Sequence, residues 1–465
     1  MYIASGNMES TITDYKLSNY LVVTDTLESG NGFLNKRVML ATRTARVMVI
    51  HNNLYDKLLN ASWDEIPSDV LAKLIDMEAI VPAEDNELQT VIGRHQASID
   101  ADATLTHVIQ PTAMCQLGCG YCGQNHTKNY LDQSASDRIL DRIEGKFAYK
   151  KYSHVSISWF GSEPLVGLSQ IREMSPKLKD MAKKHNCTYS SLVVTNGLSL
   201  KEHIFLELVK KHGVRKIEVT LDGTAEFHDA RRHTKAGLST FDLIMKNLLT
   251  IFNRPDFKEL GCAISIRCNV DERNEAGVVP LIKLLASYNL QDKIEYFYVA
   301  RIHSWGNEAH LLSHEKEDFA KKEIDWILTQ YQHGFKPGLL PGLQPVVCIS
   351  VTPNAEVFDA FGNVFDCTET PYVDTYANTE YVLGNVNNGL STISKYRPLL
   401  SFNDEVAKKE YPCSSCKMLP VCGGGCPKSW REGLVACPSN KFNVKDKLVL
   451  SYALRKGGVE VFADL

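Results

Sequence analysis

No run of apolar residues in this sequence reaches the ~18 residues that a membrane-spanning helix requires. The first residues lack the basic and then apolar stretch of a secretory signal. The sequence also has no internal repeat and no low-complexity tract. Its net charge of −4 is small for 465 residues, which argues against a general binder of nucleic acid or anionic membranes. We therefore expect a cytoplasmic protein that has neither nucleic acid nor a membrane as its partner.

Cysteine, by contrast, is abundant, with 13 in the chain. Because the cytosol keeps thiols reduced, this number does not predict a disulfide framework in a non-secreted protein. Three cysteines lie within residues 115–122, seven lie between Cys348 and Cys437, and Cys187, Cys262 and Cys268 are scattered. The clusters favour metal ligation, whereas the scattered cysteines are expected to be packing residues.

The middle of the chain alternates strand-like and helix-like stretches. The six strand-like stretches span residues 106–112, 154–160, 190–197, 216–223, 262–270 and 293–302. Apolar residues at helical spacing lie between them, for example Phe241, Ile244, Leu248 and Ile251. This pattern predicts an α/β fold with a parallel sheet, either doubly wound or curled into a partial (β/α)6 TIM-like barrel.

Alternation within the strands favours the barrel. In the fifth strand-like stretch, Ile264 and Ile266 share one face, whereas Arg267 and Asn269 share the other. A doubly wound sheet buries both faces of its strands under helices, so its strands are nearly continuous apolar runs. A polar face instead indicates a wide lumen that holds a ligand. We place this barrel at residues 105–335.

Two smaller regions flank the barrel. In residues 1–97, apolar residues alternate on both sides of a polar turn within residues 36–50, which predicts a β-hairpin. Ser68 is a plausible cap for a following helix, so we expect a small domain of a hairpin plus helices. Residues 338–465 are rich in Gly, Asn and Cys, and ligated metal is expected to stabilise them.

The first cysteine cluster is Cys115-x3-Cys119-x2-Cys122, at the end of the first barrel strand. Three thiolates suit three corners of a four-iron cluster and leave its fourth iron open to a non-protein ligand. A zinc site completed by His126 is the alternative, because Cys and His are the usual zinc ligands.

Small and polar residues follow the other strands, at the end of the barrel where such folds build their sites. The loop after the second strand consists of Gly161, Ser162, Glu163 and Pro164. Its small residues let a ligand approach the backbone, and its carboxylate suits a cationic amine. Arg231 and Arg232, after the fourth strand, suit a carboxylate.

The C-terminal cysteines are Cys348, Cys367, Cys413, Cys416, Cys422, Cys426 and Cys437. A single zinc ribbon would need only four of them. Two four-cysteine sites would need one more than are present, so one site lacks a cysteine ligand.

Together, the CxxxCxxC triad, the GSEP loop in place of GGEP and the seven-cysteine tail resemble the radical S-adenosylmethionine (SAM) enzymes with a SPASM domain. The resemblance covers residues from about 105 to 440. It implies a partial barrel whose triad cluster binds SAM at its open iron, where electron transfer cleaves the sulfonium to a 5′-deoxyadenosyl radical. It also implies three [4Fe-4S] clusters, a reductant such as flavodoxin or ferredoxin, and a SPASM domain in residues 338–465.

The resemblance assigns roles to residues of the barrel. Cys115, Cys119 and Cys122 would hold the radical-generating cluster. The loop formed by Gly161, Ser162, Glu163 and Pro164 would hold the methionyl amine of SAM, and Arg232, which matches the HDxxR pattern, its carboxylate. Further candidates for the same pocket are Thr195, Asn196 and Arg267.

The resemblance also divides the cysteines of the tail. It assigns the distal auxiliary cluster to Cys413, Cys416, Cys422 and Cys437, and the proximal one to Cys348, Cys367 and Cys426. The vacant position then belongs to the proximal cluster. A substrate thiolate, Asp359, Asp366, water or Cys268 could fill it. Strand alternation points Cys268 away from the lumen, and we favour the substrate thiolate, which predicts a thioether product.

Two differences from sulfatase-maturing relatives indicate which subfamily the sequence resembles. Sulfatase-maturing relatives carry a catalytic aspartate directly after the second tail cysteine, where this chain has Thr368. They also begin near the triad, whereas about a hundred residues precede it here. Those residues resemble the small winged-helix-like element by which peptide-modifying enzymes bind the leader of a precursor. A structural cap on the barrel is the alternative.

We therefore predict a maturase that abstracts a hydrogen from a ribosomally made precursor peptide and forms an intramolecular crosslink, either thioether or carbon–carbon. One alternative is a sulfatase-maturase-like enzyme that oxidises a Ser or Cys of a protein. The other is a non-catalytic iron–sulfur or zinc protein.

Overall fold

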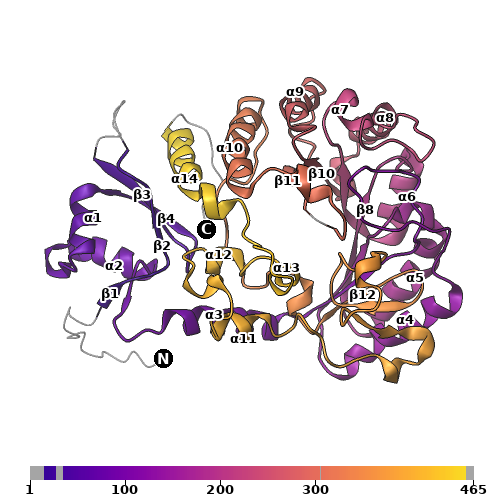
Figure 1. The fold of residues 1–465 in the computed structure, drawn as a ribbon, viewed down its shortest axis with the longest axis horizontal. Helices are drawn as coiled ribbons and strands as arrows, with labels where there is room; N and C mark the ends of the chain where they lie inside the picture. Colours follow the sequence, from indigo (N-terminus) through magenta and orange to yellow (C-terminus); the bar gives the residue numbers. More distant parts are fainter. Residues whose placement is uncertain (1–14, 28–34, 304, 457–465) are drawn as a thin grey trace. The chain divides into compact units, whose positions relative to one another are not determined.

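The computed structural model describes residues 15–27, 35–303 and 305–456 (Figure 1). Its internal contacts divide the chain into two compact units. The terminal unit takes its described residues from 1–100, 338–347 and 402–465, and the barrel unit from 101–337 and 348–401. Since a compact unit can join segments of several domains, the three expected domains stay a prediction.

The barrel unit contains a nine-stranded sheet with the order β11-β10-β9-β8-β7-β6-β12-β13-β14. Its consecutive parallel strands are β6 (Thr104–Ile109), β7 (His154–Trp159), β8 (Thr188–Thr195), β9 (Val214–Thr220), β10 (Ala263–Val270) and β11 (Tyr296–Arg301). Each strand-like stretch of the sequence overlaps one of these strands. The prediction of an α/β fold with a parallel sheet is confirmed.

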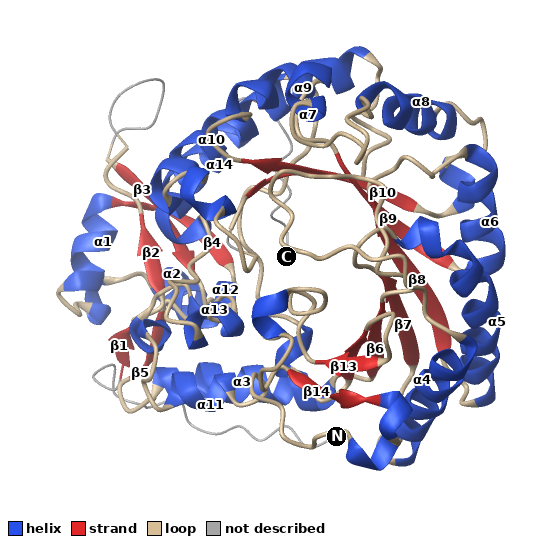
Figure 2. Cartoon of the chain, turned by 45° about the vertical axis from the view of Figure 1, so that its right-hand side comes forward, coloured by secondary structure: helices blue, strands red, loops and turns tan. Residues whose placement is uncertain are grey.

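Helices cover the outer face of this curved sheet (Figure 2). They are α4 (Gln133–Gly145), α5 (Leu168–Lys184), α6 (Glu202–His212), α7 (Ala225–Asp229), α8 (Phe241–Phe252), α9 (Val278–Ser287) and α10 (Lys316–Gln332). In α8, the four apolar residues spaced by three and four positions are all buried in the core of the barrel unit: Phe241, Ile244, Leu248 and Ile251. A single apolar stripe therefore fixes the face that each helix turns to the sheet.

The faces of the strands follow the alternation in the sequence. Ile264 and Ile266 of β10 are fully buried in the core under the helices. Arg267 and Asn269 line a cavity on the opposite face of the sheet. Cys268 belongs to the core, so it points away from the cavity, as expected.

The sheet continues on the other side of β6 with segments from late in the chain. β12 (Ala355–Phe358) pairs in parallel with β6, and β13 (Asn363–Phe365) and β14 (Val382–Asn385) follow it in antiparallel order. All four residues of β12 are buried. A strand buried on both faces has no alternating pattern, which is why β12 was not predicted.

The N-terminal part of the terminal unit is built from short strands and helices. β1 (Tyr15–Leu17) pairs with β5 (Ile80–Pro82), and β2 (Leu21–Val23), β3 (Lys36–Ala41) and β4 (Arg46–His51) form an antiparallel sheet. The helices are α1 (Asn52–Leu59), α2 (Ser68–Asp76) and α3 (Glu87–Ala101). The hairpin prediction is confirmed by β3 and β4. The prediction that Ser68 caps its helix was wrong, because Ser68 is the first helical residue and Pro67 takes the cap position.

The C-terminal part of the same unit packs against this sheet. It contains α11 (Phe402–Ala407), α12 (Leu419–Cys422), α13 (Pro427–Arg431) and α14 (Asn440–Lys456). One apolar cluster, here called the shared core, consists of the buried residues Val22, Leu27, Val38, Leu40, Met418, Val421, Val444 and Leu448. The first and last parts of the chain therefore stabilise one another by burying apolar surface.

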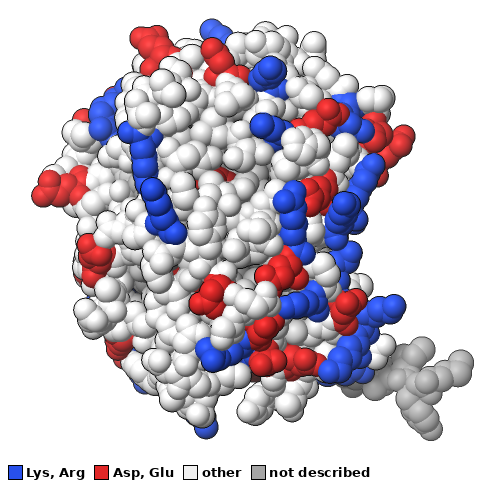
Figure 3. Space-filling model, turned by 90° about the vertical axis from the view of Figure 1, so that its right-hand side faces the viewer, with Lys and Arg blue, Asp and Glu red and all other residues white. Residues whose placement is uncertain are grey.

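None of the described helices is long and apolar enough to cross a membrane. On the face of the molecule drawn in Figure 3, basic and acidic side chains are intermixed, in keeping with the small net charge.

The shared core predicts that a substitution in α14 destabilises the N-terminal sheet. Leu448 is fully buried, so Leu448→Ala should lower the free energy of unfolding by about 2–5 kcal/mol, as for other buried leucines. Urea unfolding followed by circular dichroism measures this change. Val449→Ala is the matched control, because Val449 is 36% exposed. A double-mutant cycle with Leu40→Ala should show coupling, and simple additivity would contradict a shared core.

Candidate functional site

A cavity of about 390 Å³ lies at the carboxyl ends of the parallel strands in the barrel unit. The lining residues used below are Cys115, Cys119, Tyr121, Cys122, Gln124, Gly161, Ser162, Thr195, Asn196, Glu218, Arg232, Arg267, Asn269, His303, Trp305, Thr368 and Glu369. Most of them lie in the last residues of a strand or in the segment that connects a strand to the next element. Parallel strands bring such residues to one end of the barrel, which is the usual place for a site in these folds.

The loop that carries Cys115, Cys119 and Cys122 is held against residues 231–235. The backbone N–H groups of Gly118 and Gly120 donate to the carbonyls of His233 and Arg231, each at 3.0 Å. These bonds hold the loop across the mouth of the barrel, and all three cysteine thiols line the cavity.

Burial keeps these thiols protonated in the absence of metal. It raises the pKa of Cys115 to about 12 and that of Cys122 to about 11, with the neighbouring Glu163 adding to the rise at Cys115. It also raises the pKa of Cys119, although the guanidinium of Arg232 opposes the rise. A metal that binds here must therefore displace thiol protons.

Three thiols on one loop around one cavity are a suitable donor set for an iron–sulfur cluster. The zinc alternative needs His126 together with the cysteines, and His126 Nε2 does lie 3.9 Å from Cys122 Sγ. In the described part of the chain, however, no three His, Cys, Asp or Glu side chains are arranged around a single metal ion. An iron–sulfur cluster binds each thiolate at a different iron. Its three cysteines therefore need not surround one metal ion.

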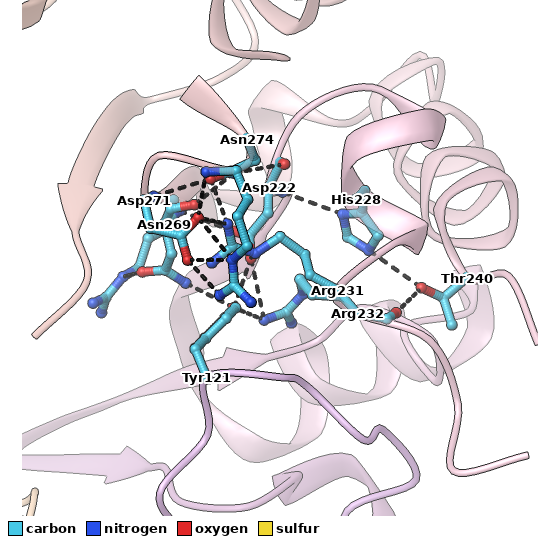
Figure 4. Close-up of polar contacts among 11 residues, drawn as sticks. Tyr121, Asp222, His228, Arg231, Arg232, Thr240, Asn269, Asp271 and Asn274 are labelled. Carbon is cyan, nitrogen blue, oxygen red and sulfur yellow. Dashed lines mark hydrogen bonds and ion pairs between the residues drawn. The ribbon is translucent and has the colours of Figure 1, made fainter. Parts of the chain in front are cut away.

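Asp222 connects this loop to the sheet (Figure 4). Its carboxylate is fully buried and accepts hydrogen bonds from the Tyr121 hydroxyl at 2.7 Å and from the backbone N–H of Asn269 at 2.8 Å. The guanidinium of Arg232 donates to the same Tyr121 hydroxyl. Tyr121 lies between Cys119 and Cys122, so this network fixes the cysteine loop relative to β9 and β10.

The two adjacent arginines have different roles. Arg232 lines the cavity, as expected for a residue that binds a carboxylate. Arg231 instead stacks over the Tyr121 ring at 4.7 Å and pairs with Asp271 at 3.0 Å. His228 accepts a hydrogen bond from the backbone N–H of Asp222 at 3.2 Å, which anchors the HDxxR segment to the end of β9.

Glu163 forms several hydrogen bonds within the protein. Its side chain is fully buried and does not line the cavity. Its oxygens accept hydrogen bonds from the Thr195 hydroxyl at 2.7 Å, from Asn196 N–H at 2.7 Å and from Leu165 N–H at 3.0 Å. The carboxylate therefore ties its loop to the end of β8, and direct binding of an amine by Glu163 stays a prediction.

Gly161 and Ser162 of this loop both have left-handed backbone conformations. Gly161 has φ +82°, and a Cβ atom there would lie 2.4 Å from the Gln110 side chain. Ser162 has φ +46°, a left-handed conformation that favours glycine. Both line the cavity with Thr195 and Asn196, whereas Pro164 is buried at the start of the following turn. Arg267 also reaches the cavity, where its Nε donates to Asn269 Oδ1 at 2.7 Å.

The four cysteines expected at the distal cluster lie together in the terminal unit. Burial raises the pKa of Cys413 to about 12, and the thiolates of Cys422, Cys437 and Cys416 add to the rise. Burial lowers the pKa of Lys441, but the thiolates of this set outweigh it and raise the pKa above its usual value. The set is therefore compact enough for its charges to interact.

The proximal set is divided between the units, with Cys348 and Cys367 in the barrel unit and Cys426 in the terminal unit. Its assignment stays a prediction. Among the candidates for its vacant position, Asp359 already accepts hydrogen bonds from Phe361 N–H at 2.9 Å and Asn363 N–H at 2.8 Å. These bonds make Asp359 a turn-forming residue, and Cys268 faces the opposite side of the sheet.

Sequence reasoning missed several residues of the cavity. Tyr121 and Gln124 flank Cys122, so they carried a local signal that went unused; Gln124 accepts a hydrogen bond from Ser162 N–H at 3.0 Å. His303 and Glu369 pair at 3.0 Å, and Trp305 Nε1 donates to the Glu369 carbonyl at 2.6 Å. His303 and Trp305 lie in the loop after β11, whereas Glu369 follows β13 much later in the chain, and no local pattern brings these two segments together.

Comparisons with known proteins agree with this geometry. Residues 109–254 match the model of the Radical SAM superfamily. The serine-type anaerobic sulfatase-maturating enzyme of Bacteroides thetaiotaomicron is 24% identical over 359 residues, 68% of this chain and 81% of that protein. The cysteine-type enzyme of Clostridium perfringens is 22% identical over 350 residues, 69% of this chain and 88% of that protein. Uncharacterized protein sll1766 of Synechocystis is 30% identical over 148 residues, which span only 36% of its own length.

A solved structure shows the same fold. Native anSMEcpe with bound AdoMet matches with a TM-score of 0.53 at 20% identity, covering 76% of this chain and 97% of that one. The chain thus contains a radical SAM domain and is an enzyme. SAM and a [4Fe-4S] cluster are the cofactors that this domain implies.

The contacts of Glu163 predict that Glu163→Gln affects both stability and cofactor binding. The amide nitrogen would face a backbone or hydroxyl donor, so we expect the free energy of unfolding to fall by about 1–3 kcal/mol. SAM affinity should fall about tenfold or more. Urea unfolding and equilibrium dialysis measure the two effects, with Glu259→Gln as the control, because Glu259 is exposed. Weaker SAM binding with unchanged stability would instead support a direct contact with the amine.

Proposed function

We propose that this enzyme is a peptide maturase that abstracts a hydrogen from a ribosomally made precursor peptide and forms an intramolecular crosslink. The observation that carries the proposal is the cavity at the barrel end, which brings three free thiols together with residues suited to SAM. The terminal unit adds a second support, because it combines a sheet that ends at β4 with a compact set of cysteines.

Different residues of the cavity would bind the catalytic cluster and SAM. Cys115, Cys119 and Cys122 would hold the catalytic cluster, and Arg232 would pair with the carboxylate of SAM. When bound, cluster and SAM together supply a 5′-deoxyadenosyl radical. The apolar core behind the strands and the loops over the cavity would keep water from this radical.

The tail cysteines would hold two auxiliary clusters, which brings the proposed number of [4Fe-4S] clusters to three. Forming a crosslink removes two hydrogens from the peptide. The first leaves as a hydrogen atom, which the radical takes, and the second leaves as a proton to solvent and an electron. The auxiliary cysteines would hold the clusters that accept this electron. A carrier such as flavodoxin or ferredoxin would exchange electrons with the enzyme.

The N-terminal sheet is proposed to bind the precursor. β4 lies at one end of the strand order β2-β3-β4. An extended peptide can add to such an edge, where backbone hydrogen bonds give affinity and side-chain contacts give specificity. Val49 on β4 is 40% exposed, so it offers an apolar contact to an added strand.

A sulfatase-maturase-like function is the second candidate. It is favoured by the two anaerobic sulfatase-maturating enzymes, whose matches cover about two thirds of this chain. Such an enzyme would oxidise a Ser or Cys side chain of a protein to an aldehyde. The two candidates differ in product, because a crosslink leaves no aldehyde.

Replacing the three cysteines of the loop separates an enzyme from a binding protein. We expect Cys115→Ala, Cys119→Ala and Cys122→Ala together to abolish formation of 5′-deoxyadenosine from SAM and dithionite, because no thiolate remains to hold the catalytic cluster. Iron and sulfide should fall by one cluster, and the tail clusters should persist. SAM cleavage by the triple variant would contradict the mechanism.

The product then decides between the two functions. Mass spectrometry of a precursor peptide encoded beside the gene, co-expressed with the wild-type enzyme, should show the loss of two hydrogens. The product should not react with a hydrazide. An aldehyde that does react would favour the sulfatase-maturase-like function.

Binding of the precursor is tested at the strand edge rather than by deletion, since removing residues 1–97 would expose the shared core. Val49→Lys should weaken precursor binding about tenfold, the effect of losing one apolar contact worth ~1.4 kcal/mol. SAM cleavage without peptide should not change. Leu59→Lys is the control, because Leu59 is an exposed apolar residue at the end of α1 and is not part of the three-stranded sheet. Equal affinities measured by fluorescence anisotropy would leave only the structural-cap alternative.

A further inference from the structure

Lys441 contacts the distal cysteine set of the terminal unit. It lies in the first turn of α14, four positions after Cys437, and its Nζ donates to Cys416 Sγ at 3.4 Å. The side chains of Cys413 and Cys422 belong to the same set. The ammonium is therefore aimed at a sulfur that would be an iron ligand.

Two other lysines of α14 form different contacts. Lys445 pairs with Asp25 at 3.6 Å, and Lys447 donates to Asn440 Oδ1 at 2.6 Å. Among the described residues, Lys441 forms no ion pair with a carboxylate, and a cysteine sulfur accepts its hydrogen bond. Its charge is thus directed at the cysteine set and is not neutralised by a neighbouring acid.

A positive charge at this position has a definite effect on a cluster. Reduction adds one negative charge, which a nearby ammonium stabilises. Hydrogen bonds to ligand sulfurs and the net charge around a cluster are among the factors that set its reduction potential. Both factors act here in the same direction and favour the reduced form.

We propose that Lys441 is a positioning residue that raises the reduction potential of the distal auxiliary cluster. The inference rests on the proposed function, which places a cluster on Cys413, Cys416, Cys422 and Cys437. A higher potential makes this cluster the stronger electron acceptor. Lys441 thereby favours electron transfer from the peptide to the distal cluster, because an electron moves spontaneously toward the higher reduction potential.

Contacts with the N-terminal sheet also fix the position of Cys416 relative to Lys441. The hydroxyl of Thr42, directly after β3, donates to the carbonyl of Lys417 at 2.6 Å and so holds the residue next to Cys416. Cys416 is also half-buried against the shared core, to which Val38 and Leu40 of β3 belong. Cys416 is thus held between the N-terminal sheet and the ammonium of Lys441.

The test uses the reconstituted full-length enzyme and a potentiometric titration followed by electron paramagnetic resonance. The signal of the distal cluster is the one that Cys413→Ala removes. Lys441→Gln removes the charge but keeps a donor, and Lys441→Met removes both. We expect Lys441→Gln to shift the ratio of reduced to oxidised cluster at least tenfold toward the oxidised form at a fixed potential, which corresponds to about 59 mV for one electron.

Three comparisons make the result decisive. Lys441→Met should shift the potential further than Lys441→Gln, and Lys441→Arg should restore it. Lys445→Gln, one turn along α14 and paired with Asp25, should leave it unchanged. The shift should shrink in high salt, because the Lys441 side chain is exposed.

Each other outcome has a separate meaning. An unchanged potential in Lys441→Gln, or an equal shift in Lys445→Gln, overturns the role of Lys441 and leaves the proposed function intact. If Cys413→Ala removes no iron and no signal, the distal assignment itself fails, and the inference fails with it. Iron and sulfide content, measured on the same samples, distinguishes these cases.

Discussion

A buried carboxylate, Asp222, is the constraint on which the geometry of the site depends. A charge with no exposure to solvent is stable only when donors surround it, and the donors here come from three segments. Tyr121 belongs to the cysteine loop, Asn269 to β10 and Arg231 to the segment after α7. The need to satisfy one carboxylate therefore brings the cysteine loop, Arg232 and the strand ends to one cavity.

The sequence predicted those parts of the fold whose signal is local. Alternation in β10 and helical spacing in α8 identified the core, and the cysteine loop was correctly expected at a strand end. Contacts between distant segments were missed, as in the pairing of β12 with β6, because a strand buried on both faces carries no periodicity. The hydrogen bonds of Glu163 to Thr195 and Asn196 are a further example, because they join two loops that lie about thirty residues apart in the chain.

Two proposed functions belong to the terminal unit: binding of the precursor peptide and binding of the distal cluster. The sheet whose edge would bind a peptide and the cysteines that would hold the distal cluster bury their apolar side chains in the same core. The partly buried Cys416 and Cys422 pack against that core directly. A strain imposed on β3 is therefore transmitted to the residues around these thiols through close-packed side chains, which deform little.

This shared core also governs how the chain is made. Leu40 emerges early from the ribosome, but its partner Leu448 is synthesised about 400 residues later, roughly 20–80 s at ~5–20 residues per second. Through that interval the apolar side of the N-terminal sheet lacks its cover, a state in which nascent chains aggregate. The sheet of the barrel unit is also completed late, because β6 is synthesised long before β12, the strand with which it pairs. Completion of both units is therefore a late event, because each needs a segment that is synthesised long after its partner.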